Sequence, residues 1–328
     1  MVTETSRRAA TLTALLMAKQ SAYGTIATDF SSPTADTARL WTAGVGVGVG
    51  RLKKRPQGWM TTSLAGGTTG SHSLPDRSVG AFVALATPES LEMLLRSNWG
   101  AFAVGSFTLA SQVNEYFTLG WVESRLSGST QKLVRVKDAW CHELTLRSVG
   151  VGRLTLEAQY AARTTPDTAL NSLGAIVLPS LTSDVPPDVN LFSTRTCQLI
   201  RDPLGANVDL RYAELELTFR QQVTAEHWMT DGFGVHKKGL TEVELAVRGY
   251  VSDETWAILN DNRSDTKRRF RLVATAPSPA KTLQIDLYEM NLEVGELGHR
   301  GPREYRALEL RGVAAVDSSS NFVTISLT

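Results

Sequence analysis

The stretch Leu240-Thr-Glu-Val-Glu-Leu-Ala-Val-Arg-Gly-Tyr-Val-Ser-Asp-Glu-Thr-Trp-Ala-Ile-Leu259 joins an alternating segment to a short helix-like segment. In its first part, apolar side chains alternate with Glu and Arg, which is the period of a β-strand with one face in a core and the other facing water or a partner. Ser252 or Asp253 then supplies a helix cap ahead of Glu254. The stretch therefore predicts a strand followed by a helix over Glu254–Asp261.

The same pattern occurs in the first half of the chain. An alternating run from Leu74 ends at Thr87, which caps a helix predicted over Glu89–Ser97 with Pro88 at its first position. Two further pairs of segments keep the same order: Trp140–Leu146 with Tyr288–Val294, and Leu154–Ala162 with Ala307–Ala315. These matches predict an internal duplication with insertions in loops. Chance similarity between two sets of alternating strands is the alternative.

A proline-containing segment separates the two halves. Residues 164–190 hold Pro166, Pro179, Pro186 and Pro187 among Ser, Thr and Asp, which is typical of an extended linker. We therefore expect a first β domain with an N-terminal arm over residues 1–163 and a second over residues 191–328. The predicted fold is mainly β: two tandem, similar β-sandwich or partial-barrel domains, each with a short flanking helix. A further helix is predicted over Ala9–Gln20.

Composition narrows the function. The 328 residues are 42% hydrophobic and carry 34 Lys+Arg against 33 Asp+Glu, a net charge of +1, so the chain is a folded protein without a global charge signature of nucleic-acid binding. Two basic clusters, Arg51–Arg55 and Lys267–Arg271, are interpreted as solvated faces or ion-pair partners. Cys141 and Cys197 cannot form a disulfide framework, and we expect half-buried free thiols.

No catalytic signature is present in the sequence. It has no phosphate-binding loop, no zinc-protease motif and no nucleophile elbow. Glycine recurs at every second place in Gly44–Gly50, but Arg51–Pro56 follows, which cannot begin the helix of a dinucleotide site. We expect a twisted strand there, close to another backbone. The five histidines are scattered, so no metal site, no cofactor and no enzymatic activity are expected.

Three features carry a resemblance to a known family. The segment Ala18-Lys-Gln-Ser-Ala-Tyr-Gly-Thr-Ile-Ala27, the twofold repeat and the final strand Asn321–Thr328 together resemble the tail tube proteins of long-tailed (siphovirus-type) bacteriophages, in their duplicated-domain version. The resemblance implies a structural virion protein whose β-sandwich domains form rings. The rings stack into a hollow tube that conducts DNA from the capsid to the host.

The resemblance also implies partners and a location. The ring is expected to be a homotrimer that imitates a hexamer through six similar domains, and its rings stack helically. Expected partners are further copies of the chain, the tape measure protein in the lumen, tail tip and terminator proteins, and DNA in transit during ejection without specific binding. The protein is expected in the virion tail, assembled in the host cytoplasm and without a membrane partner.

Glutamates on the polar faces of the predicted strands are candidates for the channel lining. An acidic lumen would repel DNA and let it slide, whereas a basic one would hold it. The lumen candidates are Glu143, Glu157, Glu214, Glu216, Glu242, Glu244, Glu289, Glu293 and Glu309. Arg153, Arg220, Arg248 and Arg271 alternate on similar strands, and pairing across subunits is the alternative for them.

Contacts between subunits or rings are expected in the N-terminal segment, in the glycine-rich region 44–70 and in Thr224–Gly239. The last is longer than a hairpin loop needs and holds large apolar side chains, which suits a partner surface or the end of a sandwich equally. The candidate contact residues are Tyr23, Val45, Val47, Trp59, Trp228, Met229, Phe233 and His236.

Two other classes of protein remain open. One is the inner tube of a contractile or secretion-type machine, which shares the fold but usually lacks the duplication. The other is a virion adhesion or carbohydrate-binding protein with two β-sandwich domains, which scattered tryptophans favour: Trp41, Trp59, Trp99, Trp121, Trp140, Trp228 and Trp256. Assembly of the purified chain into rings would separate the tube from the adhesion protein.

Overall fold

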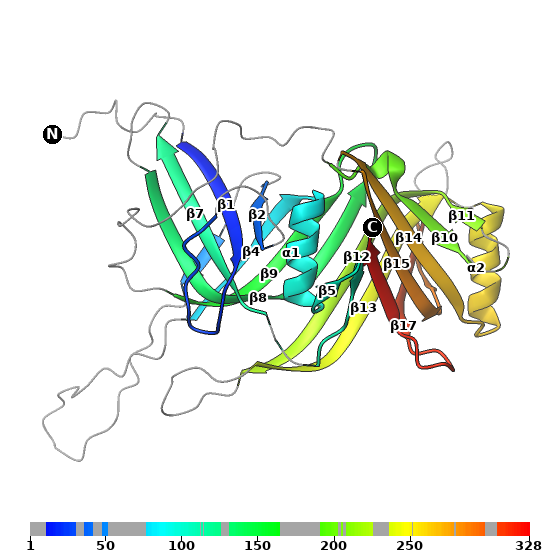
Figure 1. The fold of residues 1–328 in the computed structure, drawn as a ribbon. Helices are drawn as coiled ribbons and strands as arrows, with labels where there is room; N and C mark the ends of the chain where they lie inside the picture. Colours follow the sequence, from blue (N-terminus) through cyan, green and yellow to red (C-terminus); the bar gives the residue numbers. More distant parts are fainter. Residues whose placement is uncertain are drawn as a thin grey trace, which may run out of the picture.

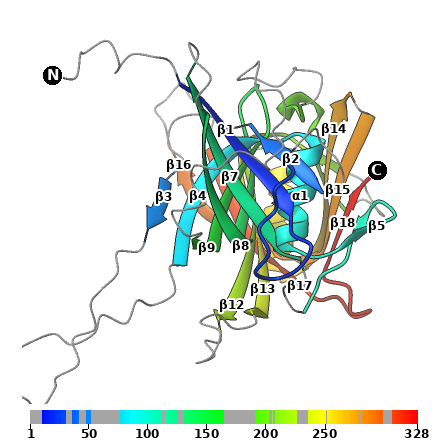
Figure 2. The same cartoon turned by 60° about the vertical axis from the view of Figure 1, so that its left-hand side comes forward.

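The protein is mainly β, with two α-helices in the part of the chain that the structure describes (Figures 1 and 2). The computed structural model describes residues 11–30, 36–41, 48–51, 77–111, 113, 115–125, 131–164, 191–202, 205, 208–225, 236–250, 252–278, 280–298 and 307–328. The strand pairs within it are antiparallel. The mainly-β prediction is confirmed.

The elements of the first half run in the following order: β1 (Thr11–Lys19), β2 (Thr37–Leu40), β3 (Gly48–Arg51), β4 (Arg77–Leu85), α1 (Pro88–Asn98), β5 (Phe102–Ala103), β6 (Ser106–Phe107), β7 (Phe117–Arg125), β8 (Gln131–Val149) and β9 (Thr155–Thr164). Those of the second half are the 3-10 turn η4 (Thr194–Thr196), β10 (Gln198–Arg201), β11 (Val208–Leu210), β12 (Tyr212–Ala225), β13 (His236–Tyr250), α2 (Asp253–Arg263), β14 (Arg268–Pro277), β15 (Ala280–Met290), β16 (Glu293–Gly298), β17 (Ala307–Ala315) and β18 (Val323–Leu327).

The 19-residue strand β8 takes part in two runs of strands. Its first part pairs with β7, which continues through β1 to β2. On its other edge it pairs with β9, which continues through β4 to β3. The first half is therefore built from the strand orders β2-β1-β7-β8 and β8-β9-β4-β3, held together by one long strand.

The second half repeats this connectivity. The order β11-β10-β14-β15 matches the first run, and β16-β17-β13-β12 matches the second. The long strand is interrupted here, because Asn291 and Leu292 separate β15 from β16. At this break β17 carries Gly312, where a Cβ would lie 2.5 Å from the carbonyl oxygen of Asn291. Strand pairing thus supports the duplication that the sequence predicts.

Both helices follow equivalent strands and begin in the same way. α1 follows β4 and α2 follows β13, and each contains 11 residues. The hydroxyl groups of Thr87 and Ser252 cap them, and each cap forms a capping box with the third helical residue, Ser90 or Thr255. The helices predicted over Glu89–Ser97 and Glu254–Asp261 and the role of Thr87 are confirmed, and Ser252 rather than Asp253 is the second cap.

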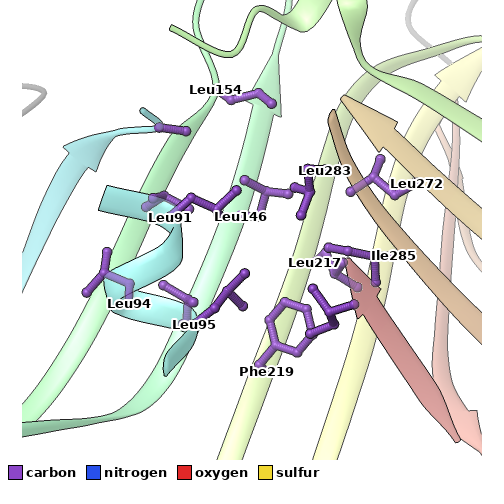
Figure 3. Packing of buried hydrophobic residues seen from close by; sticks show 14 of the residues in the cluster. Leu91, Leu94, Leu95, Leu146, Leu154, Leu217, Phe219, Leu272, Leu283 and Ile285 are labelled. Carbon is purple, nitrogen blue, oxygen red and sulfur yellow. The ribbon is translucent and has the colours of Figure 1, made fainter. Parts of the chain in front are cut away.

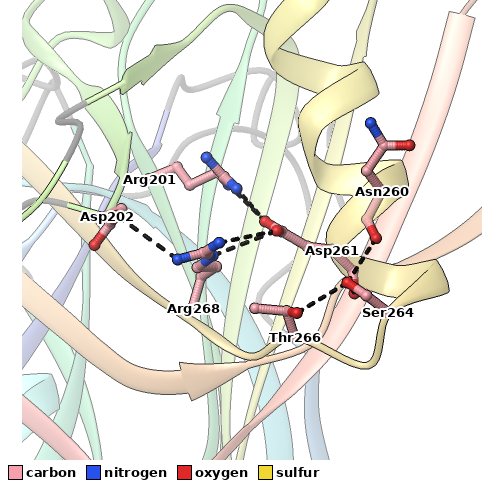
Figure 4. Close-up of polar contacts among 7 residues, drawn as sticks. All are labelled: Arg201, Asp202, Asn260, Asp261, Ser264, Thr266 and Arg268. Atoms are coloured by element: carbon pink, nitrogen blue, oxygen red, sulfur yellow. Dashed lines mark hydrogen bonds and ion pairs between the residues drawn. The ribbon is translucent and has the colours of Figure 1, made fainter.

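Each helix is fastened near its C-terminal end by an ion-pair cluster, and the sign of the central charge is inverted between the halves. In α1, Arg96 pairs with Glu115 at 2.9 Å and with Asp36 at 3.1 Å. In α2, Asp261 pairs with Arg201 and Arg268 (Figure 4). Asp36 precedes β2 and Glu115 precedes β7, whereas Arg201 ends β10 and Arg268 begins β14, so each cluster ties its helix to two strands of its own half.

The two halves share one sheet and one hydrophobic core. The last part of β8 pairs with β12 from Glu143 to Val149, which produces the continuous order β3-β4-β9-β8-β12-β13-β17-β16. Strand β6 from the first half also pairs with β18, the last strand. Leucines of α1 and β8 belong to the same buried cluster as Phe219 of β12 and Ile285 of β15 (Figure 3).

Three predictions of local structure are corrected or completed. Ala9–Gln20 was expected as a helix, but its described part is strand β1. Ala14 to Ala18 are all buried, so the strand has no polar face, and a short apolar run does not distinguish a strand from a helix. Cys141 and Cys197 are free thiols, fully buried rather than half-buried. From Gly44–Gly50, the described residues 48–50 form a strand, and linker residues 165–190 lie outside the described part.

Candidate functional site: the charged face of the sheet

The eight-stranded run β3-β4-β9-β8-β12-β13-β17-β16 has an apolar face and a charged face. On β12, Leu215, Leu217 and Phe219 are at most 1% exposed and point into the core. Glu214, Glu216, Thr218 and Arg220 alternate with them and point the other way. The same alternation holds on β8 and β13, so the sequence pattern itself places the charged side chains on one surface.

The register aligns charged residues in rows across the strands. Arg220 of β12 lies opposite Glu143 of β8 on one side and Glu242 of β13 on the other. Glu214 lies opposite Arg248 of β13, which in turn lies opposite Glu309 of β17. Directly opposed side chains share a face in an antiparallel pair. The rows therefore form one continuous charged face, which we call the carboxylate face.

Arg220 is the centre of the largest ion-pair group on the carboxylate face. Its guanidinium lies 2.7 Å from Glu244, 3.2 Å from Glu242 and 3.4 Å from Glu143. Desolvation lowers the pKa of Arg220, but hydrogen bonding to Glu244 and the nearby carboxylates raise it overall. One cation on β12 thus pairs with carboxylates of the two neighbouring strands, β8 and β13, and holds their side chains in place.

Smaller ion pairs continue the pattern along the face. Arg147 lies 2.8 Å from Glu216 and Arg248 lies 3.7 Å from Glu214. Arg311 lies 2.6 Å from Glu309, and this hydrogen bond raises its pKa. Because these groups are largely exposed, each pair contributes only about 0–1 kcal/mol to stability. Their main effect is to fix the positions of the charged side chains on the surface.

The carboxylate face has an excess of negative charge. It brings together all nine predicted lumen candidates: Glu143, Glu157, Glu214, Glu216, Glu242, Glu244, Glu289, Glu293 and Glu309. The cations among them in the described residues are Arg147, Arg220, Arg248, Lys267 and Arg311. On β4 the face includes the apolar Val83, which is 38% exposed opposite Glu157.

A hollow of about 330 Å³ lies on this face near the break between β15 and β16. It is lined by Lys267, Glu289, Glu293 and Arg311, among others. Lys267 pairs with Glu289 at 3.6 Å, so the hollow contains charges of both signs. This balance suits a hydrated surface more than a pocket for one charged ligand.

Sequence reasoning missed the cations that belong to the face. Arg147 and Arg311 were not singled out, although Glu143-x-Thr145-x-Arg147 alternates as clearly as the glutamates do. For the arginines that were considered, pairing across subunits was the alternative. Within the single chain, Arg220 and Arg248 pair with glutamates of the carboxylate face, and Arg271 pairs with Asp286 at 2.7 Å. The backbone of Arg153 forms an isolated β-bridge with Ser193. Pairing of these arginines across subunits stays a prediction.

The predicted contact residues are not gathered at one place in the described structure. Tyr23 is 39% exposed and packs edge-on against Tyr116, with ring centroids 5.0 Å apart. His236 is the first residue of β13, in register with Ala225. The others lie outside the described residues: Val45, Val47, Trp59, Trp228, Met229 and Phe233.

The described residues offer little for catalysis. Burial raises the pKa of Cys141 to about 12 and that of Cys197 to about 11, so neither thiol is a ready nucleophile. No group of three or more His, Cys, Asp or Glu residues capable of holding a metal ion occurs in the described ranges. None of the described helices has the length and apolar character to cross a membrane.

The described tryptophans do not share an exposed surface. Trp99 and Trp140 are buried. Trp41 is half-buried beneath the guanidinium of Arg39, and Trp256 is 47% exposed on α2. An aromatic platform for sugars is therefore not formed by these four side chains.

Comparison with known proteins adds no relative. No protein-family model matches the chain, and no curated protein matches it either.

Proposed function

We propose that this chain is a structural subunit of a hollow, DNA-conducting tube, of the kind that the tail tube proteins of long-tailed bacteriophages form. The observation that carries the proposal is the eight-stranded run with one apolar face, one carboxylate face and an unshared strand at each end. Such a sheet is suited to close on itself with further copies, because closure removes exposed edges.

The two faces of the sheet suit different sides of the wall of a tube. The apolar face is covered by the other strand run of each half, β2-β1-β7-β8 and β11-β10-β14-β15, and by α1, so it is already used within the chain. The carboxylate face has no such cover among the described residues, and its polar groups suit a water-filled channel. In the proposed ring, this face lines the lumen and the helices lie outside it.

The charge pattern suits DNA in transit. Double-stranded DNA carries about one negative charge per 1.7 Å, and its binding is driven by cations that neutralise phosphates. The five cations named above are each engaged by a glutamate of the same chain, and nine carboxylates stand beside them on the carboxylate face. The proposed lumen therefore repels phosphates weakly and evenly, which favours sliding over retention.

The proposal is tested by the assembly state of the purified protein. Mass photometry and negative-stain electron microscopy on one sample are expected to show rings of three copies with a central hole, or stacks of such rings. Assembly is expected at high protein concentration or on an added tail initiator complex. Monomers under both conditions would contradict the proposed function.

A further inference from the structure

We infer that β16 of one copy pairs with β3 of the next copy, in the register that β8 and β12 already adopt inside each chain. The internal β8–β12 junction joins the two repeated units. In the repeat, β16 is the counterpart of β8, and β3 is the counterpart of β12. A contact that the chain makes once between its halves is therefore available again between neighbouring chains.

The outer edges needed for this contact are unshared in the described part of the chain. There, β16 pairs only with β17 and β3 pairs only with β4. These two edges end the eight-stranded run on opposite sides. Because they differ, their association is head-to-tail, and a suitable rotation closes it into a ring.

The internal junction also fixes the expected register. In it, Leu144, Leu146 and Arg147 of β8 lie opposite Phe219, Leu217 and Glu216 of β12. Matching the β8–β9 pairing to the β16–β17 pairing gives the residue of β16 that corresponds to each residue of β8. Matching the β12–β13 pairing to the β3–β4 pairing gives the residue of β3 that corresponds to each residue of β12. The expected partners across the new junction are Val294 with Arg51, Leu297 with Val49, and Gly298 with Gly48.

The unequal burial of the two helices points to the same neighbour. Nine of the 11 residues of α1 are buried, and second-half groups cover its end: Trp99 stacks on Phe322, and the Asn98 amide donates a hydrogen bond to the carbonyl oxygen of Phe219. In α2, of the same length, only Thr255 and Ile258 are buried. Trp256, the counterpart of the buried Leu91, is 47% exposed.

In the proposed assembly, the next copy of the chain would bury the residues of α2 that are exposed in the single chain. Phe219 belongs to β12, so the cover over the end of α1 comes from the strand whose counterpart is β3. A neighbouring chain that adds its β3 to β16 brings its own first half toward α2. Both observations, the edges and the helix, therefore select a second copy of this chain as the occupant. The inference rests on the proposed function only in that both require association between copies of this chain.

Disulfide trapping tests the register. The double variant Val49→Cys with Leu297→Cys places two cysteines opposite each other, where Cβ atoms of paired strands lie about 4.5–5.5 Å apart. Mild oxidation is expected to link copies into covalent multimers on a non-reducing gel, up to a closed ring. Cys141 and Cys197 stay buried and do not compete. Each single variant is a control that cannot give a chain of links.

A matched control separates register from mere proximity. Val49→Cys with Glu293→Cys shifts one cysteine along β16 by roughly 10 Å, given about 3.3 Å per residue and the irregularity within β16. That distance exceeds the reach of a disulfide, so this pair is expected to remain unlinked in the same assembled sample.

The outcomes distinguish this inference from the proposed function. Rings that form without the Val49–Leu297 link, or with equal linking in the shifted pair, would overturn the junction and leave the tube intact. Linked copies that build no ring with a central hole would support the junction and contradict the tube. Monomers that never link would overturn both.

Discussion

At the scale of single residues, Arg220 shows how the carboxylate face is held. Glu143, Glu242 and Glu244 converge on it from two neighbouring strands. We expect Arg220→Gln to lower the free energy of unfolding by roughly 1 kcal/mol at low salt, because three glutamates then face one another without their shared cation. In 1 M salt the loss is expected to shrink, since screening weakens the repulsion.

Chemical denaturation at two salt concentrations measures this effect. Arg311→Gln is the matched control, because Arg311 is 62% exposed in its side chain and forms one ion pair, with Glu309, among the described residues. It is expected to change stability by less than about 0.5 kcal/mol. Equal losses for both variants, independent of salt, would contradict the central role of Arg220.

We expect the free energy of unfolding to depend on pH through Asp286, which lies on β15 in the strand run β11-β10-β14-β15. Burial alone would raise its pKa, but hydrogen bonds from Arg271, Arg269 and Gln284 lower it below the ordinary value of 3.8. A lowered pKa means that the stabilisation is complete above pH 3.8 and is lost as the pH falls through the folded-state value. We expect Asp286→Asn to cost roughly 2–3 kcal/mol at pH 7, because it leaves the partly buried Arg269 and Arg271 without their charged partner.

The measurement for Asp286 is the free energy of unfolding from pH 7 to pH 2. The gap between wild type and Asp286→Asn is expected to narrow below about pH 4 as the native carboxylate becomes protonated. A gap that stays constant over this range would show that Asp286 does not titrate as proposed.

At the scale of elements, α1 and α2 have the same length and the same capping box but differ in how many of their residues are buried. The shared caps and length make them equivalent, while Trp256 remains exposed on α2. We expect Trp256→Glu to fold as a monomer, because the side chain meets water in the single chain, and to fail in ring assembly, because a charge would be buried there. Circular dichroism and mass photometry measure the two properties.

Trp256→Phe keeps an apolar ring and is the control for this prediction. It is expected to fold and to assemble as the wild type does. Normal rings from Trp256→Glu would show that α2 stays exposed in the assembly.

The elements also show what the sequence can predict. Alternation identified β4 and β13, and caps identified both helices, because these signals are local. Strand β1 was missed because Ala14 to Ala18 are buried on both faces and leave no polar period. The β8–β12 junction has no local signal at all, since pairing between strands about 70 residues apart depends on the whole fold.

The candidate site was predictable for the same reason. Every second residue on a strand shares a face, so the nine glutamates could be assigned to polar faces from alternation alone. Whether these glutamates lie on one surface depends on the pairing register of the strands, which places Glu143 opposite Arg220 and Glu214 opposite Arg248. The loop candidates, such as Trp228 and Phe233, lie outside the described residues and remain predictions.

At the scale of the whole molecule, the sign of the lumen is the testable property. The double reversal Glu157→Lys with Glu242→Lys replaces two exposed carboxylates of the face with cations. Assembled tubes of this variant are expected to retain duplex DNA at 50 mM salt and release it as salt rises, since the new cations neutralise phosphates. Wild-type tubes are expected to retain little at either salt concentration.

A filter-binding assay with short duplex DNA measures this retention. Asp209→Lys on β11 is the control, because it adds an exposed cation in the other strand run. It is expected to leave retention unchanged. Unaltered DNA retention and delivery after the double reversal would argue against a lumen lined by the carboxylate face.

Cryo-electron microscopy of the assembled protein, at a resolution that separates strands, tests the central claim most directly. The account predicts a closed barrel around a central channel, built from β3-β4-β9-β8-β12-β13-β17-β16 of each copy. Glu157, Glu216 and Arg220 would face the channel, and α1 and α2 would lie outside it. An assembly whose carboxylate face points outward, or packs against protein, would contradict the claim.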